Sequence, residues 1–263
     1  MSKPKTKMMD ARDVARLMES RQPQTNKMHK AALRVLANYQ SSGEPFSLFL
    51  SSWSFDEKRK RFLSFLKEVG VRKEAPGNVQ VRIGLERQVR VVLKKMADLE
   101  TVAVYRKGDH MRIAMPEEWP ALTLADEEWR ARVTEIAVWA DLIVLFWGVT
   151  TPGLAEELEI CSSGSNPLKT VVVLPATPTE IFRSQIRKSF PRVVPLSEIP
   201  PFYPLHSEFS PLIDRMKAIK SIDPRIRSGF VDPKKRLKKF PLPPTSGRFE
   251  GDIWIEQFGR TID

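Results

Sequence analysis

The chain is poor in the residues on which disulfides and metal sites depend. Its 263 residues include one cysteine, Cys161, which excludes an internal disulfide and any zinc site built from several cysteines. The three histidines, His29, His110 and His206, are far apart and lack the spacing of metal ligands. We therefore expect no metal site.

Long apolar segments are also missing. The longest apolar run, at residues 142–147, has the length of a β-strand and falls far short of the roughly 20 residues that span a bilayer. The basic N-terminus is not followed by the apolar stretch of a secretory signal. Together with the single cysteine, these features predict a cytoplasmic protein with no transmembrane segment.

The net charge of +11 is concentrated at the two ends of the chain. Residues 1–34 contain nine Lys or Arg against three acidic residues, and residues 215–240 contain ten against two. We expect a basic N-terminal extension over residues 1–43 and a weakly structured, basic, proline-containing tail over residues 223–263. Such segments either stay solvated and aid solubility, or contact nucleic acid or an anionic surface through non-specific electrostatics.

Over residues 44–222, short apolar segments alternate with amphipathic ones. The segments between the apolar runs predict helices, because their apolar residues recur three and four positions apart, and the same pattern predicts a helix at residues 27–39. A loop is expected around Pro116 and Pro120. This alternation predicts an α/β, three-layer flavodoxin-like (Rossmann-like) fold with a mostly parallel five-stranded sheet in the order 2-1-3-4-5. The predicted strands are residues 46–50, 101–105, 142–147, 170–174 and 193–196.

A ligand site is expected where the strand order changes direction, between the first and third predicted strands. The loops that follow these strands, residues 51–56 and 148–153, are rich in serine, threonine and glycine. Such loops either form ordinary turns or let backbone N–H groups approach an anionic ligand. The candidate ligand-binding residues, in these two loops and after the second strand, are Ser51, Ser52, Trp53, Asp56, Arg106, Thr151 and Gly153.

A predicted helix with several carboxylates follows the second of these loops. Glu156 and Glu159 lie on one face of this helix, whereas Glu157 points elsewhere. A glutamate one turn into the helix could orient a ribose hydroxyl or stabilise a cationic sugar transition state. The alternative is that these acids only favour the helix dipole and face water. The chain contains no GxGxxG and no GxxxxGK[ST] motif, so neither standard phosphate-binding loop is predicted.

Two segments resemble Toll/interleukin-receptor (TIR) domains. Residues 46–57, FSLFLSSWSFDE, are similar to the first box of that family, a strand that ends in small hydroxyl residues before an acidic helix start. Residues 140–147, ADLIVLFW, and then GLAEEL at 153–158 resemble its third strand and the helix that carries its glutamate. This second region is also similar to nucleoside deoxyribosyltransferase-like proteins, in which a proline-glycine turn precedes a catalytic glutamate.

The resemblance implies a TIR-like domain that self-associates or binds a partner signalling protein in bacterial defence or signalling. It also implies cleavage of the N-glycosidic bond of NAD or a related nucleotide, with Glu157 as the catalytic residue, Glu156 as the alternative, and no required cofactor. The family's serine and tryptophan-cysteine pair before the glutamate are replaced here by TTPG at residues 150–153 and by Ala155. Two other hypotheses stay open: a non-enzymatic module that binds a nucleotide or partner domain, and a nucleic-acid-associated protein.

Overall fold

The computed structural model describes residues 22–50, 89–95, 97–106, 119–147, 152–174, 186–195 and 207–245. Its core is a six-stranded sheet in the order β3-β2-β1-β4-β5-β6, and every neighbouring pair of strands is parallel. The five predicted strands are β1, β2, β4, β5 and β6, and their order is the predicted one, so the α/β Rossmann-like fold is confirmed. The strands are β1 (Phe46–Leu50), β2 (Glu100–Arg106), β3 (Ala121–Leu124), β4 (Leu142–Phe146), β5 (Thr170–Leu174) and β6 (Arg192–Pro195).

The sheet has six strands rather than the predicted five. The additional strand, β3, lies at one edge of the sheet and pairs with β2. We expected a loop in this part of the chain because prolines precede it and because the apolar run is short. The sequence Ala-Leu-Thr-Leu after Pro120 nevertheless suits an edge strand of four residues, three of which are buried.

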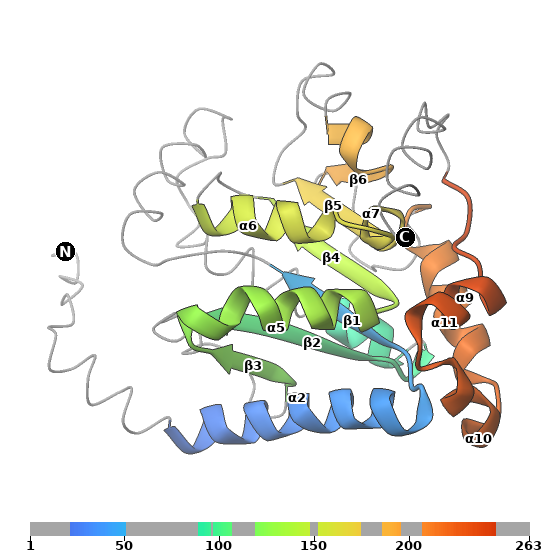
Figure 1. The fold of residues 1–263 in the computed structure, drawn as a ribbon, viewed down its shortest axis with the longest axis horizontal. Helices are drawn as coiled ribbons and strands as arrows, with labels where there is room; N and C mark the ends of the chain where they lie inside the picture. The colour runs from blue at the N-terminus through green and yellow to red at the C-terminus, as the bar shows by residue number, and fades with distance from the viewer. Residues whose placement is uncertain are drawn as a thin grey trace, which may run out of the picture.

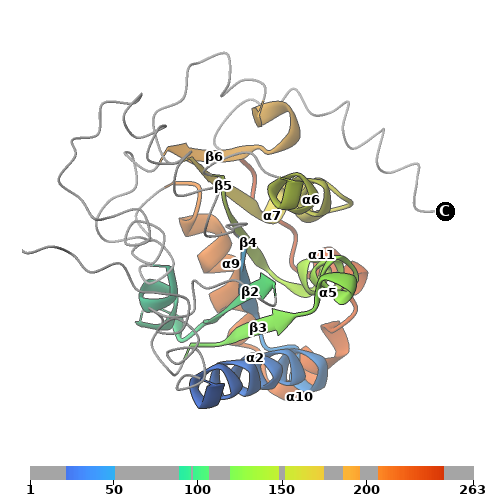
Figure 2. The same cartoon turned by 90° about the vertical axis from the view of Figure 1, so that its left-hand side faces the viewer.

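Helices cover both faces of the sheet (Figures 1 and 2). The helices α5 and α6 and the helical residues 186–189 pack on one face, whereas α9 and the helical residues 89–95 pack on the other. A hydrophobic core lies on each face of the sheet, and successive residues of the central strands point into opposite cores. Leu145 lies in the core beneath α5 and α6, and Val144 lies in the core beneath α9. A strand that is buried on both faces is expected to be rich in apolar residues, and β4 is apolar throughout. The helices with these positions are α5 (Asp126–Trp139), α6 (Pro152–Cys161) and α9 (Ser210–Lys220).

The edge strand β3 is covered by the long helix α2 (Gln22–Ser42), which runs beneath it in Figure 1. This helix contributes Leu36 and Tyr39 to one core and Met28 to the other, so the helix predicted at residues 27–39 is confirmed. The ring nitrogen Nδ1 of His29 accepts a hydrogen bond of 3.4 Å from the backbone N–H of Thr123 in β3. None of the helices in the described segments is at once long and apolar enough to cross a membrane.

Residues 223–245, which are the described part of the tail that we expected to be weakly structured, are folded. The helices α10 (Pro224–Arg227), η3 (Ser228–Phe230) and α11 (Pro233–Lys239) lie beside α9, at the right of Figure 1. Asp223 and Asp232 cap α10 and α11 by accepting hydrogen bonds from the backbone N–H groups two residues later. A proline follows each aspartate at the first helical position, where an N–H group would have no helical partner.

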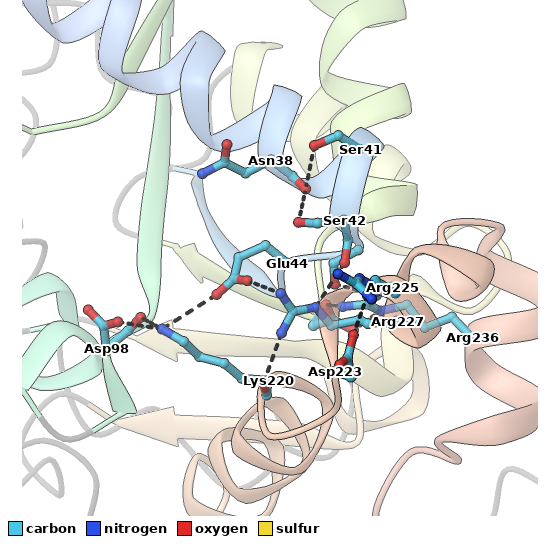
Figure 3. Close-up of polar contacts among 12 residues, drawn as sticks. Asn38, Ser41, Ser42, Glu44, Asp98, Lys220, Asp223, Arg225, Arg227 and Arg236 are labelled. Carbon is cyan, nitrogen blue, oxygen red and sulfur yellow. Dashed lines mark hydrogen bonds and ion pairs between the residues drawn. The ribbon is translucent and has the colours of Figure 1, made fainter.

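Buried arginines join this C-terminal segment to the amino ends of the strands. Arg227 pairs with Glu44, just before β1, and Figure 3 shows this pair inside a wider group of polar contacts. Arg236 of α11 and Arg215 of α9 both donate hydrogen bonds to the buried carboxylate of Asp141, just before β4. A buried charge is tolerated when it is paired and hydrogen-bonded. Part of the positive charge that we expected to be exposed in this region, on Arg215, Arg227 and Arg236, therefore lies inside the protein.

Candidate functional site

The carboxyl ends of β1 and β4 lie side by side at the point where the strand order changes direction. β1 pairs with β2 on one side and with β4 on the other, and Leu50 stands opposite Leu145. From β1 the chain goes on to β2, and from β4 it goes on to β5, so the two connections leave in opposite directions across the sheet. In open parallel sheets a crevice forms at such a point and is the usual place for a ligand.

The helix that follows β4, α6, carries the candidate glutamates. Leu154, Glu157 and Cys161 are three and four positions apart and all buried, so Glu157 is on the side of α6 that faces the sheet. Glu157 is only 2% exposed, whereas its neighbour Glu156 is half-buried. Gly153, another predicted site residue, lies in the first turn of the helix and is also half-buried. The two glutamates therefore occupy different environments.

Glu157 also acts on the single cysteine of the chain. Burial raises the pKa of the Cys161 thiol, and the negative charge of Glu157 raises it further. Cys161 therefore stays a protonated thiol, which is a poor nucleophile. Glutamate is rarely buried so completely, and it is costly to charge unless polar groups approach it. A buried carboxylate among the apolar residues of α6 makes Glu157 the strongest candidate for chemistry at this edge.

Arg106, the last residue of β2, organises a second group of side chains at the same edge. Its guanidinium donates a hydrogen bond of 2.6 Å to the Glu156 carboxylate and lies 3.8 Å from the carboxylate of Asp126. Its Cζ atom stands 4.4 Å from the centre of the Trp129 ring, which is a cation–π contact. Because β1 lies between β2 and β4, the Arg106–Glu156 pair reaches across the end of β1.

The structure brings together three of the predicted site residues, Arg106, Glu156 and Glu157, at the carboxyl edge of the sheet. The side chains of Arg106 and Glu156 are 32% and 34% exposed, so a ligand at this edge can reach both. A fourth predicted residue, Gly153, lies in the first turn of α6. The other five lie outside the described residues, and their predicted roles stay predictions. They are Ser51, Ser52, Trp53, Asp56 and Thr151.

Sequence reasoning did not find Asp126 and Trp129, which both come from the first turn of α5. Trp129 is a buried core residue, and its ring also lies against the Arg106 guanidinium. No local sequence pattern reveals this contact, because it joins the end of β2 to α5, and β3 lies between them in the chain. The sequence contained one indication of this contact: β2 ends in an arginine, Arg106, and the helix α5 later in the chain begins with three acidic residues that could pair with it.

No family model, no curated protein and no solved structure matches this chain. Within the described ranges, no group of three or more His, Cys, Asp or Glu side chains is arranged to hold a metal ion. The features that mark this edge of the sheet are the strand order, the burial of Glu157 and the contacts of Arg106.

Proposed function

We propose that this chain is a TIR-like protein that cleaves the N-glycosidic bond of NAD or a related nucleotide. The observation that carries the proposal is the burial of Glu157 on the sheet-facing side of the helix that follows the central strand β4. A sheet with this strand order usually binds its ligand beside that helix. The resemblance of residues 46–57 and 153–158 to TIR domains supplies the bond that is broken and a setting in cytoplasmic bacterial defence or signalling, with self-association.

The chemistry needs one well-placed negative charge. When the bond between ribose C1′ and the pyridinium nitrogen breaks, its electron pair goes to the nitrogen and nicotinamide leaves as a neutral molecule. The ribose is left with positive charge, which a nearby carboxylate stabilises, and water then adds to C1′ and loses a proton. Glu157 suits this role because it is shielded from solvent, and a shielded charge acts more strongly than one in water. Glu156 suits it less, because about a third of its side chain is exposed to solvent.

Arg106 supports the proposal as the cation that meets the nucleotide. It stands at the carboxyl end of β2, beside the switch point, and about a third of its side chain is exposed. The Trp129 ring and the carboxylates of Glu156 and Asp126 hold its guanidinium in place. A held arginine loses less side-chain entropy when it binds a phosphate or a ribose hydroxyl.

A second candidate is a module that binds a nucleotide or a partner domain without cleaving a bond. The near-complete burial of Glu157 favours it, because a carboxylate that solvent barely reaches also suits a purely structural hydrogen bond. Both candidates use the same edge of the sheet, and they differ only in whether a bond is cleaved there.

Release of nicotinamide from NAD by the full chain separates the two candidates. The assay should be run by chromatography over a range of protein concentrations, since activity in such a domain is expected to need self-association. Glu157→Gln should lower the rate about 100-fold or more, which is the usual contribution of a positioned catalytic group. Glu159→Gln is the matched control, because Glu159 lies on the same helix but pairs with Arg130 at the surface. The control should keep the wild-type rate.

Three outcomes decide the matter. No nicotinamide release from NAD or its phosphorylated form at any protein concentration rejects the enzyme, and NAD binding that is weakened by Arg106→Ala then supports the non-enzymatic module. Equal rates for Glu157→Gln and Glu159→Gln reject Glu157 as the catalytic residue. Thermal unfolding of each variant, followed by circular dichroism, separates a lost reaction from a lost fold.

A further inference from the structure

The basic residues of the C-terminal segment fall into two groups that differ in burial. The arginines Arg215, Arg227 and Arg236 are buried and bonded to carboxylates or backbone carbonyls of the domain. The lysines of α11 are all exposed, and none forms an ion pair with any residue that the structure describes. We call these four lysines, Lys234, Lys235, Lys238 and Lys239, the lysine face.

Helical geometry places the lysine face on one side of α11. At about 100° per residue, the four lysines fall within an arc of roughly 140°. The opposite side carries Arg236, which is 2% exposed, and Leu237, which is half-buried. Because Arg236 is bonded to Asp141 and to the carbonyl oxygen of Gly43, α11 is fixed in its rotation about its own axis. The lysine face is therefore held outward by the fold.

We propose that the lysine face binds the phosphate backbone of double-stranded nucleic acid without reading its sequence. Duplex DNA carries one negative charge about every 1.7 Å along its axis, and lysines neutralise such charge by displacing bound counterions. Lysines one helical turn apart, such as Lys234 and Lys238, are separated by about 6 Å along α11, which is close to twice the axial distance of about 3.4 Å between successive phosphates on one strand. This binding site is independent of the activity proposed for Glu157.

Two observations favour a duplex over other anionic partners. A helix that lies in a membrane surface buries an apolar face in the lipid, but the side of α11 away from its lysines packs against the protein. Single strands are usually bound by stacking bases on aromatic rings, yet Phe240, next to the lysine face, packs edge-on against Phe230 with ring centres 5.6 Å apart. The face offers cations without an apolar or aromatic partner, which is what backbone contacts require.

Binding of the full chain to a labelled random-sequence DNA duplex, measured by fluorescence anisotropy between 50 and 200 mM salt, tests the proposal. Replacing all four lysines of the face by alanine should reduce the slope of log K against log salt by about 3.6, since each phosphate contact contributes about 0.9. Over that range the wild type should therefore lose roughly 150-fold more affinity than the variant. The four lysines replaced by arginine should retain binding.

A control variant removes the same charge elsewhere. Lys30→Ala, Arg34→Ala, Lys95→Ala and Lys188→Ala together take away four exposed cations that lie on three different helices. This control should keep the wild-type slope. Equal losses in the two alanine variants would attribute binding to net charge and overturn the proposal. An unchanged slope in the lysine-face variant, or binding to anionic phospholipid vesicles with none to the duplex, would overturn it as well.

Discussion

Asp141→Asn should destabilise the protein strongly, although Asp141 lies far from the proposed site. Its side chain is 2% exposed and accepts two hydrogen bonds from Arg236, at 2.9 and 2.5 Å, and one of 2.7 Å from Arg215. Arg215 also donates to the backbone carbonyl of Phe240, and Arg236 to that of Gly43. One carboxylate thus balances two guanidinium groups that hold α9 and α11 against the start of β4.

The expected magnitude follows from what the substitution leaves behind. Asparagine keeps the shape of the side chain and one acceptor oxygen, but the two arginines lose their counter-charge. Removing one partner of a buried ion pair typically costs about 3–5 kcal/mol. We expect about 3 kcal/mol for Asp141→Asn and about 5 kcal/mol for Asp141→Ala, which also leaves a cavity. Because domains are stable by only about 5–15 kcal/mol, a substantial part of the fold's stability is at stake.

Urea unfolding followed by circular dichroism measures this loss. Asp214→Asn on α9 is the matched control, because Asp214 is exposed and forms only a surface pair with Lys217; we expect a change within about 0.5 kcal/mol. Adding Arg236→Met to Asp141→Asn should recover part of the stability, since one of the two buried arginines that lost their counter-charge is then removed. A cost for Asp141→Asn no larger than that of Asp214→Asn would refute the reasoning.

Because of the Asp141 carboxylate, we expect the free energy of unfolding to depend on pH in the acid range. Burial alone would raise the pKa of Asp141, but the charges and hydrogen bonds of Arg236 and Arg215 hold it below its ordinary value of 3.8. A lowered pKa in the folded state means that the ionised carboxylate stabilises the fold above about pH 4, and that this stability is lost as the pH falls further. The difference in unfolding free energy between wild type and Asp141→Asn should therefore shrink in acid.

Two further predictions concern buried groups near this network. Burial lowers the pKa of Lys169 to about 7, below its ordinary 10.5, so its contribution to stability should rise with pH above 7. In urea unfolding, the wild type should therefore gain stability between pH 7 and 8.5, whereas Lys169→Met should show no such gain. At higher pH the raised pKa of Cys161 opposes the trend. Gly43 ends α2 at φ 64°, and an added Cβ would stand 2.6 Å from the carbonyl oxygen of Arg227, so Gly43→Ala should cost about 3 kcal/mol. Gly164→Ala, at φ 57° with open space around it, should cost only about 1 kcal/mol, and equal melting temperatures for the two variants would contradict the steric argument.

The sheet could be predicted because its physical causes are local. Strands buried on both faces are predominantly apolar: β4 is apolar throughout, and β1 and β5 each contain one hydroxyl residue, Ser47 and Thr170. Helical segments between parallel strands then allow few arrangements, since such crossovers are right-handed. The edge strand β3 escaped prediction because a strand of four residues gives too short a pattern, and its burial depends on α2, which comes from a distant part of the chain.

The folded C-terminal segment was missed for a different reason. Its high charge resembles a solvated tail, and its helices are too short for a periodic apolar pattern. Its arginines are tolerated inside the protein only because Asp141 and Glu44, far away in the sequence, balance them. One local signal was readable: Asp-Pro occurs at the start of both α10 and α11, and it combines a capping side chain with a proline at the first helical position.

The candidate site was predictable in position but not in contacts. Strand order alone placed Glu156, Glu157 and Arg106 near one edge of the sheet. Which glutamate is buried depends on how α6 is rotated against the sheet, and the notable feature is that Glu157 occupies a position that apolar spacing would reserve for a hydrophobic residue. The pairing of Arg106 with Glu156 joins residues that are distant in the sequence, so no spacing rule anticipates it.

The same chemical pair, arginine with carboxylate, serves opposite purposes at the two ends of the sheet. At the amino end, Asp141 and Arg236 are 2% and 3% exposed, so separating them leaves buried charges and costs several times RT. At the carboxyl end, Arg106 and Glu156 are each about one-third exposed, and such a pair typically contributes less than about 1 kcal/mol. A ligand that offers Arg106 a phosphate oxygen can therefore displace Glu156 at little cost, whereas nothing comparable can open the amino end. Binding should accordingly rearrange the carboxyl edge and leave the C-terminal helices in place.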